Sequence, residues 1–137
     1  MKLLLAVISF FIAGTSVQAA TLEEFAAILE ANSWGWSVVE NGCVEQYRVF
    51  SFNRDFTKMQ SFISEGNVTI DYRVLGHSHN SITMQIIGED RLDDDGAPVV
   101  WQLRFAGEGM ICWRRTDWLL FDCTRPLLRC DTTPPAS

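Results

Sequence analysis

Residues 68–86, VTIDYRVLGHSHNSITMQI, carry the clearest structural pattern in this chain. Apolar side chains take every second position on both sides of a polar loop at 76–80; they are Val68, Ile70, Tyr72, Val74, Ile82, Met84 and Ile86. A period of two is typical of a β-strand that buries one face and exposes the other to water. The segment therefore predicts two antiparallel strands joined by a short loop.

The same period continues on both sides of this segment. Short alternating stretches separated by turn residues predict further strands at 34–38, 43–52, 57–63, 99–105, 110–118 and 125–130. Glu40-Asn41-Gly42 predicts a hairpin turn between the first two, since Asn-Gly tolerates positive φ. Before them, Thr21 and Glu24 form a capping box at the start of an amphipathic helix over 22–31.

These elements predict a mainly β fold, an antiparallel up-and-down meander of about 7–8 strands with a short N-terminal helix. A flat sheet of that size would leave a large apolar face uncovered and two unpaired edges. Closure into a barrel removes both problems. We therefore expect a closed or nearly closed barrel, with the helix covering one of its mouths.

The first 20 residues have the pattern of an export signal. A basic start precedes an apolar run over 3–13, and small residues at 17–20 suit signal cleavage. The prediction is a signal peptide over 1–20, one β-barrel domain over 21–131 and a disordered tail over 132–137. We expect a periplasmic or extracellular protein that does not insert into a membrane after signal removal.

The charge balance excludes one class of partner. The chain has 17 acidic and 11 basic side chains, and removal of 1–20 takes away Lys2. The mature protein would therefore carry a net charge of about −7. Nucleic-acid binding depends on basic patches that contact phosphates, so no nucleic-acid partner is expected.

The four cysteines predict two disulfides, because an even number in a short exported domain is typical of an oxidising compartment. The rival interpretation, a zinc site, lacks the paired CxxC spacing. Four cysteines allow three connectivities. Strand direction in the meander favours Cys112 with Cys130, across the last hairpin, and Cys43 with Cys123, at the opposite end.

The order of elements resembles the calycin group of small barrels, which includes lipocalins, fatty-acid-binding proteins and avidins. The resemblance is carried by a helix, the Trp34-Gly35-Trp36 stretch in the first strand, and Arg114-Arg115 in strand seven. It implies an eight-stranded barrel in which Trp34 or Trp36 packs under one of the two arginines.

Strand seven itself also points to an unusual site. Alternation there forces either Arg114 or Arg115 inward, and an inward arginine needs an anionic or carbonyl partner. One interpretation is an anion-binding site inside the barrel, with ligand-binding residues Trp36, Tyr72, Trp101 and Arg114. The other is a structural cluster of Trp34, Glu89 and Arg115 that closes one end of the barrel.

Catalytic and metal sites have little support in the sequence. Covalent acyl chemistry needs a nucleophile oriented by a base, yet His77 and His79 share one loop and no Gly-x-Ser-x-Gly occurs. Asp93–Asp95 do not alternate as calcium-loop ligands do. We expect no catalytic residue, no metal and no cofactor.

The sequence thus predicts a non-enzymatic binding module for a small apolar or anionic ligand. The alternative is a protein-interaction role, such as an inhibitor or immunity protein against an envelope-acting enzyme. In that case a loop at 40–42 or 93–96 would insert into the partner. The sequence is also compatible with an envelope protein that has neither role.

Overall fold

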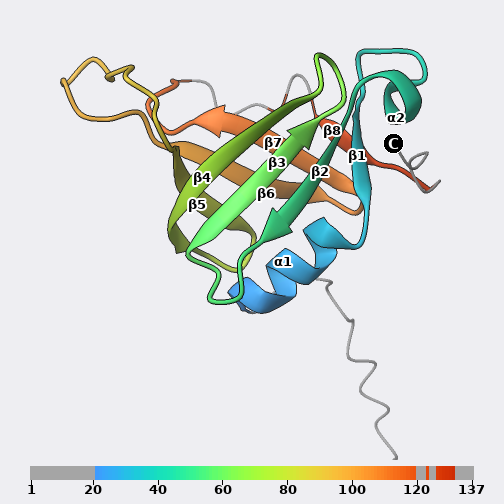
Figure 1. Ribbon diagram of the computed structural model, residues 1–137, viewed down its shortest axis with the longest axis horizontal. Helices are drawn as coiled ribbons and strands as arrows, with labels where there is room; N and C mark the ends of the chain where they lie inside the picture. Colours follow the sequence, from blue (N-terminus) through green and yellow to red (C-terminus); the bar gives the residue numbers. More distant parts are fainter. Residues whose placement is uncertain (1–20, 120–122, 124–125, 132–137) are drawn as a thin grey trace, which may run out of the picture.

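The computed structural model describes residues 21–119, 123 and 126–131, and these fold into a closed antiparallel β-barrel with a short N-terminal helix (Figure 1). Each strand pairs with the next, and the last strand pairs with the first. The mainly β meander and its closure are confirmed. The predicted signal peptide at 1–20 and the predicted tail at 132–137 lie outside the described residues.

Eight strands make the barrel wall. They are β1 (Ser33–Trp36), β2 (Tyr47–Phe52), β3 (Lys58–Ile63), β4 (Val68–His77), β5 (Ser81–Ile86), β6 (Trp101–Gly107), β7 (Met110–Arg115) and β8 (Leu127–Arg129). Inward-facing apolar residues alternate with outward-facing polar ones along β4, β5 and β6, as the period of two predicts.

Helix α1 (Leu22–Glu30) closes one end of the barrel (Figure 1). The Thr21 side chain accepts a hydrogen bond from the Glu24 N–H at 3.1 Å, so the predicted cap forms. Phe25 and Leu29 are fully buried, and the Phe25 ring stacks on Phe105 at 4.2 Å between centroids. The Trp34 indole of β1 donates to the Leu29 carbonyl at 3.1 Å, which fastens the helix to the barrel wall.

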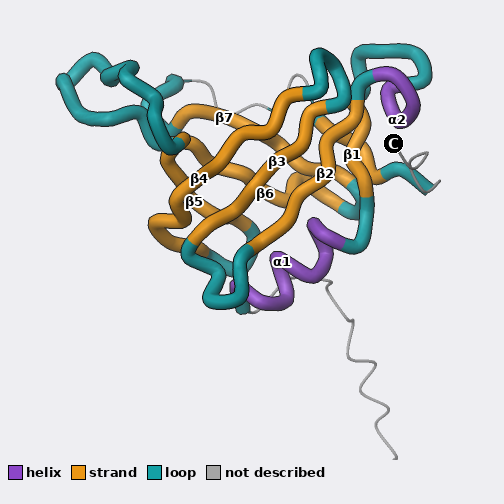
Figure 2. The backbone as a smooth tube through the Cα atoms, viewed as in Figure 1, coloured by secondary structure: helices purple, strands orange, loops and turns teal. Residues whose placement is uncertain are grey.

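The strands alternate in direction, so loops 37–46, 64–67, 87–100 and 116–119 lie at the end away from α1. We call this end the far end; Figure 2 shows the connecting loops in teal. Turns 53–57, 78–80 and 108–109 lie at the α1 end. No helix among the described residues has the length and apolar character needed to cross a membrane.

The connection between the first two strands differs from the predicted hairpin. Asn41 does take a left-handed conformation, with φ of 60°, but the next residues form the short helix α2 (Gly42–Glu45) rather than the start of strand two. Helix α2 packs against β1: a Cβ at Gly35 would lie 2.6 Å from the Cys43 nitrogen. The glycine between the two tryptophans therefore permits this close approach.

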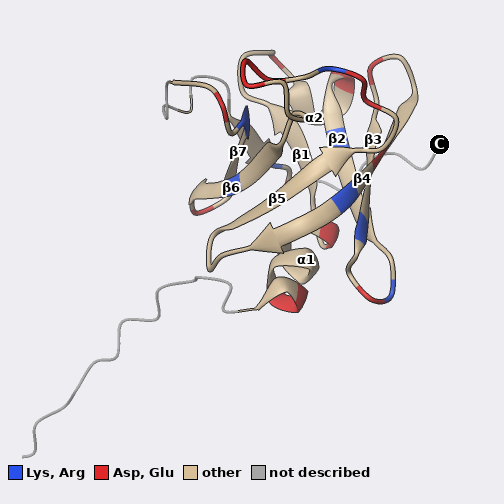
Figure 3. Ribbon diagram, turned by 90° about the vertical axis from the view of Figure 1, so that its left-hand side faces the viewer, with Lys and Arg blue, Asp and Glu red and all other residues tan. Residues whose placement is uncertain are grey.

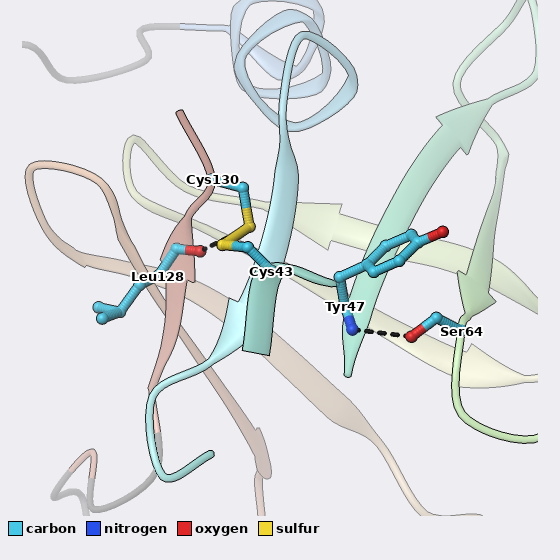
Figure 4. The surroundings of a disulfide bond; sticks show 5 residues. All are labelled: Cys43, Tyr47, Ser64, Leu128 and Cys130. Carbon is cyan, nitrogen blue, oxygen red and sulfur yellow. Dashed lines mark hydrogen bonds between the residues drawn. A yellow bond between two sulfur atoms is a disulfide. The ribbon is translucent and has the colours of Figure 1, made fainter. Parts of the chain in front are cut away.

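Both predicted disulfide pairings are wrong: the bonds join Cys43 to Cys130 and Cys112 to Cys123. The first error follows from α2. Because this helix folds back against β1, Cys43 lies beside the chain segment that leaves β8 and reaches Cys130 there (Figure 4). A strand beginning at Cys43 would have held that side chain at the far end instead.

The second error concerns the last hairpin. The observed register pairs Ile111 with Leu127, whereas a bond between positions 112 and 130 requires a different register. Cys112 faces outward on β7 and bonds to Cys123. Two disulfides fit an oxidising, exported environment.

Candidate functional site

The side chains inside the barrel are fully buried at the α1 end, and several are only partly buried at the far end. Around α1, the inward side chains of Trp34, Phe50 and Ile111 are at most 1% exposed. Toward the far end, several inward side chains are only half-buried; they are Trp36, Arg48, Ile63, Ile70, Ile86 and Trp113. The inward side chains are therefore buried less completely at the far end, which we call the mouth.

Arg48 of β2 is one of these half-buried inward side chains. It lies opposite Trp34 in the β1–β2 ladder, so its side chain is directed into the barrel. Its guanidinium carbon is 5.5 Å from the ring centroid of Trp36 and 5.5 Å from that of Trp113. Contact with two indoles is favourable for a cation, because each ring presents negative charge on its face.

The aromatic contacts continue from Trp113 around the mouth. The Tyr72 ring meets Trp113 edge-on at 5.3 Å, and the Trp101 ring lies 6.0 Å from Trp113. These distances are in the range of favourable ring pairs. We call Trp36, Arg48, Tyr72, Trp101 and Trp113 the mouth cluster; strands β1, β2, β4, β6 and β7 each contribute one member.

Glu89, in loop 87–100, ties this loop to the mouth cluster. Its side chain is only 8% exposed, and it accepts a hydrogen bond from the Trp101 indole at 2.9 Å. It also forms an ion pair with Arg91, whose guanidinium lies 5.6 Å from the Trp101 ring centroid. The loop is therefore fixed over Trp101 by a charged pair and an indole hydrogen bond.

Arg48 differs from the other mouth arginines because no carboxylate neutralises it. Among the described residues, Arg91 pairs with Glu89 and Arg115 with Asp117, but Arg48 has no ion pair. Its buried Nε also lacks a hydrogen-bond acceptor there. Burial lowers the pKa of Arg48, an effect that nearby Tyr72 opposes. A buried donor without an acceptor raises the free energy of the folded protein, so a hydrogen-bond acceptor placed beside the Arg48 Nε would be stabilising.

Burial also raises the pKa of the Tyr72 phenol, against the opposing effects of Ser61 and Arg48. An unfolded tyrosine ionises near pH 10. The stabilisation due to neutral Tyr72 is therefore complete below about pH 10 and is lost as the pH rises through the higher folded-state pKa. The free energy of unfolding should fall more steeply above about pH 10 in the natural protein than in Tyr72→Phe. Urea unfolding followed by tryptophan fluorescence tests this; equal slopes in the two proteins would contradict it.

Three of the four predicted ligand-binding residues come together. Trp36, Tyr72 and Trp101 belong to the mouth cluster, whereas Arg114 does not. Alternation on β7 turns Trp113 inward and Arg114 outward. Arg114 is nevertheless buried, because the following loop covers it: its guanidinium donates to the carbonyls of Arg115, Thr116 and Trp118. Its observed role is to hold that loop.

The predicted structural cluster of Trp34, Glu89 and Arg115 is only partly assembled. Trp34 lies at the α1 end, bonded to Leu29. Arg115 pairs with Asp117 at 2.7 Å, and this bond, more than the nearby Glu89, raises the pKa of Arg115. The predicted stacking of a strand-seven arginine on a strand-one tryptophan is replaced by Arg48 on Trp36.

Sequence reasoning missed Arg48, although the signal was present. Arg48, Phe50 and Phe52 alternate along β2, and Phe50 is 1% exposed, so the arginine shares the inward face. Strand β7 does turn one of its two arginines inward, because Arg115 lies opposite Trp101 in the β6–β7 ladder. For Arg48, alternation along a strand with two phenylalanines was the available signal.

The other candidates form no site of this kind. Within residues 21–119, 123 and 126–131, no three His, Cys, Asp or Glu side chains are placed to share a metal ion. A shallow groove of about 500 Å³ crosses the outer surface of β2, β3 and β4, lined by Ser51, Phe52, Asn53, Lys58, Met59, Gln60, Asp71 and Ile87. None of the residues that line this groove belongs to the mouth cluster.

Comparison with known proteins adds no relative. No protein-family model, no curated protein and no solved structure matches the chain. The eight-stranded antiparallel closed barrel is compatible with a calycin-like barrel, and the observed geometry carries the functional argument by itself.

Proposed function

We propose that this protein is a non-enzymatic binding module for a small ligand that combines an anionic group with an apolar body. The observation that carries the proposal is Arg48, a largely buried guanidinium between two indoles with no carboxylate partner among the described residues. A carboxylate or similar anion would supply the missing acceptor and neutralise the charge.

The apolar body follows from the surroundings of Arg48. The half-buried rings of Trp36 and Trp113 offer flat apolar contact surface beside the guanidinium, and the fully buried Tyr72 ring packs edge-on against Trp113. The α1 end is filled by Phe25, Trp34 and other fully buried side chains. The body of the ligand would therefore lie in the mouth, against the half-buried aromatic rings, rather than deep in the barrel.

The location of binding follows from the cysteines and the N-terminus. Two disulfides support folding in an oxidising compartment. With the predicted signal peptide at 1–20, the proposed place of action is the periplasm or the extracellular medium.

Decanoate and decanol provide a direct test, because they share an apolar chain and differ in charge. Decanoate should bind at least about tenfold more tightly than decanol, since a charge-assisted hydrogen bond contributes about 1.5–3 kcal/mol. Arg48→Met should remove this preference by weakening decanoate and leaving decanol nearly unchanged. Isothermal titration calorimetry measures both affinities, and tryptophan fluorescence reports contact with the rings beside Arg48.

Arg73→Met is the matched control, because Arg73 is exposed on the outer face of β4 and its loss changes the net charge equally. It should keep the preference for decanoate. Equal binding of acid and alcohol to the natural protein, binding of neither, or a preference that survives in Arg48→Met would each overturn the proposal.

A further inference from the structure

A second surface surrounds the mouth. We call the exposed loops 37–46, 64–67, 87–100 and 116–119 the rim. From the chemistry of the rim we infer that it docks a second protein whose surface is basic and carries exposed apolar side chains. This inference is independent of the small-ligand site, because it depends on outward residues of the loops and not on the mouth cluster.

Exposed apolar side chains are concentrated at the rim. Val38 and Val44 are 61% and 62% exposed, Leu92 is 59% exposed, and Leu119 is 93% exposed. Ile87 and Trp118 add further half-exposed area. Loops 37–46 and 87–100 follow β1 and β5, so these side chains stand on opposite sides of the mouth. Apolar groups gathered around one end of a barrel indicate an interaction surface.

The charge of the rim selects the kind of partner. Its loops contain nine carboxylates and one arginine; two of the carboxylates are in ion pairs, Glu89 with that arginine and Asp117 with Arg115, and the other seven have no ion pair among the described residues. Figure 3 shows acidic segments in the loops at the far end. Such a surface repels nucleic acids and anionic lipid headgroups and attracts a basic protein, whose approach it would also accelerate.

The acidic tip of loop 87–100 is ordered. The Asp93 carboxylate accepts hydrogen bonds from the N–H groups of Asp95 and Ala97 at 3.0 and 2.9 Å, and Leu92 pairs with Pro98 across the loop. Asp94 and Asp95 are left exposed beside Leu92. Charge and apolar surface are thus held together before binding, which reduces the entropy lost on association.

Three short peptides of equal length test whether binding needs both positive charge and apolar side chains. One contains lysine and leucine, one lysine and serine, and one glutamate and leucine. The lysine–leucine peptide should bind the full mature protein, and its affinity should fall at least about tenfold between about 0.05 and 0.5 M salt. The other two should bind at least about tenfold more weakly, because each lacks one of the two complementary features. Isothermal titration calorimetry measures all three.

Matched variants locate the contact. Asp94→Asn with Asp95→Asn should weaken the lysine–leucine peptide by about threefold to tenfold, whereas Glu23→Gln with Glu108→Gln, at the α1 end, should not. Leu92→Ser should weaken binding of the lysine–leucine peptide. Leu75→Ser should not, because it removes the same side chain from an exposed position on the wall of β4, away from the rim.

Several outcomes would overturn the inference. Equal binding of the lysine–serine peptide would show attraction by charge alone, and equal effects of rim and control variants would show no localised surface. Preferential binding to phosphatidylcholine vesicles over the lysine–leucine peptide would assign the apolar side chains to a membrane instead. Because all these variants are surface changes, circular dichroism should confirm that each protein is folded.

Discussion

Replacing Cys43 and Cys130 together with serine should lower the free energy of unfolding by about 4–5 kcal/mol. The bond joins residues 87 positions apart and so restrains most of the barrel in the unfolded chain. In the chain-entropy description, stabilisation rises with the number of residues that a disulfide encloses. Urea unfolding followed by tryptophan fluorescence measures the loss.

Cys112→Ser with Cys123→Ser is the matched control. This bond encloses a segment with a sequence separation of only 11, so its removal should cost about 3 kcal/mol. A larger loss from the short bond than from the long one would contradict the entropic account. Peptide mapping without reduction should recover Cys43 joined to Cys130; any other partner would contradict the observed topology.

Trp34→Ala should lower the free energy of unfolding by about 3–5 kcal/mol. The indole is 1% exposed, and its N–H donates to the Leu29 carbonyl at the end of α1. The substitution leaves a cavity beneath the helix and removes the hydrogen bond that fastens the helix to the wall. Thermal and urea unfolding measure the loss, and hydrogen exchange should show faster exchange of the α1 amides.

Two further variants separate cavity from hydrogen bond. Trp34→Phe keeps most of the apolar volume, so its cost should be about 1–3 kcal/mol, including the unpaired Leu29 carbonyl. Trp118→Ala removes a tryptophan that is 47% exposed and should cost less than about 1 kcal/mol. If Trp34→Ala were no more damaging than Trp118→Ala, the packed α1 end would not be a main source of stability.

The strands were predictable where the sequence alternates without interruption. The pattern over 68–86 corresponds to β4 and β5, and Ile82 and Met84 are fully buried as it requires. A period of two is a local property of the chain, since successive strand side chains point to opposite faces wherever the strand lies. The helix cap at Thr21 is local in the same sense, because it joins residues three positions apart.

The candidate site was predictable only in part. Inward-facing Tyr72 and Trp101 follow from alternation, and their strands bring them together once the sheet closes. Alternation places Arg114 on the outward face of β7, so its burial depends on the loop that folds over it. No local pattern indicates that a later loop will cover an outward side chain.

The strand order, the inward face of most strands and the capped helix could be predicted from sequence patterns, because they depend on neighbouring residues and on the need to bury one face of a sheet. Three features could not be predicted in this way: the cysteine pairing, the placement of Arg48 between Trp36 and Trp113, and the partial burial of side chains at the far end. Each depends on how connections such as α2 fold back onto the barrel. That is set by close contacts between distant segments, as at Gly35 and Cys43, rather than by the periodicity of any one segment.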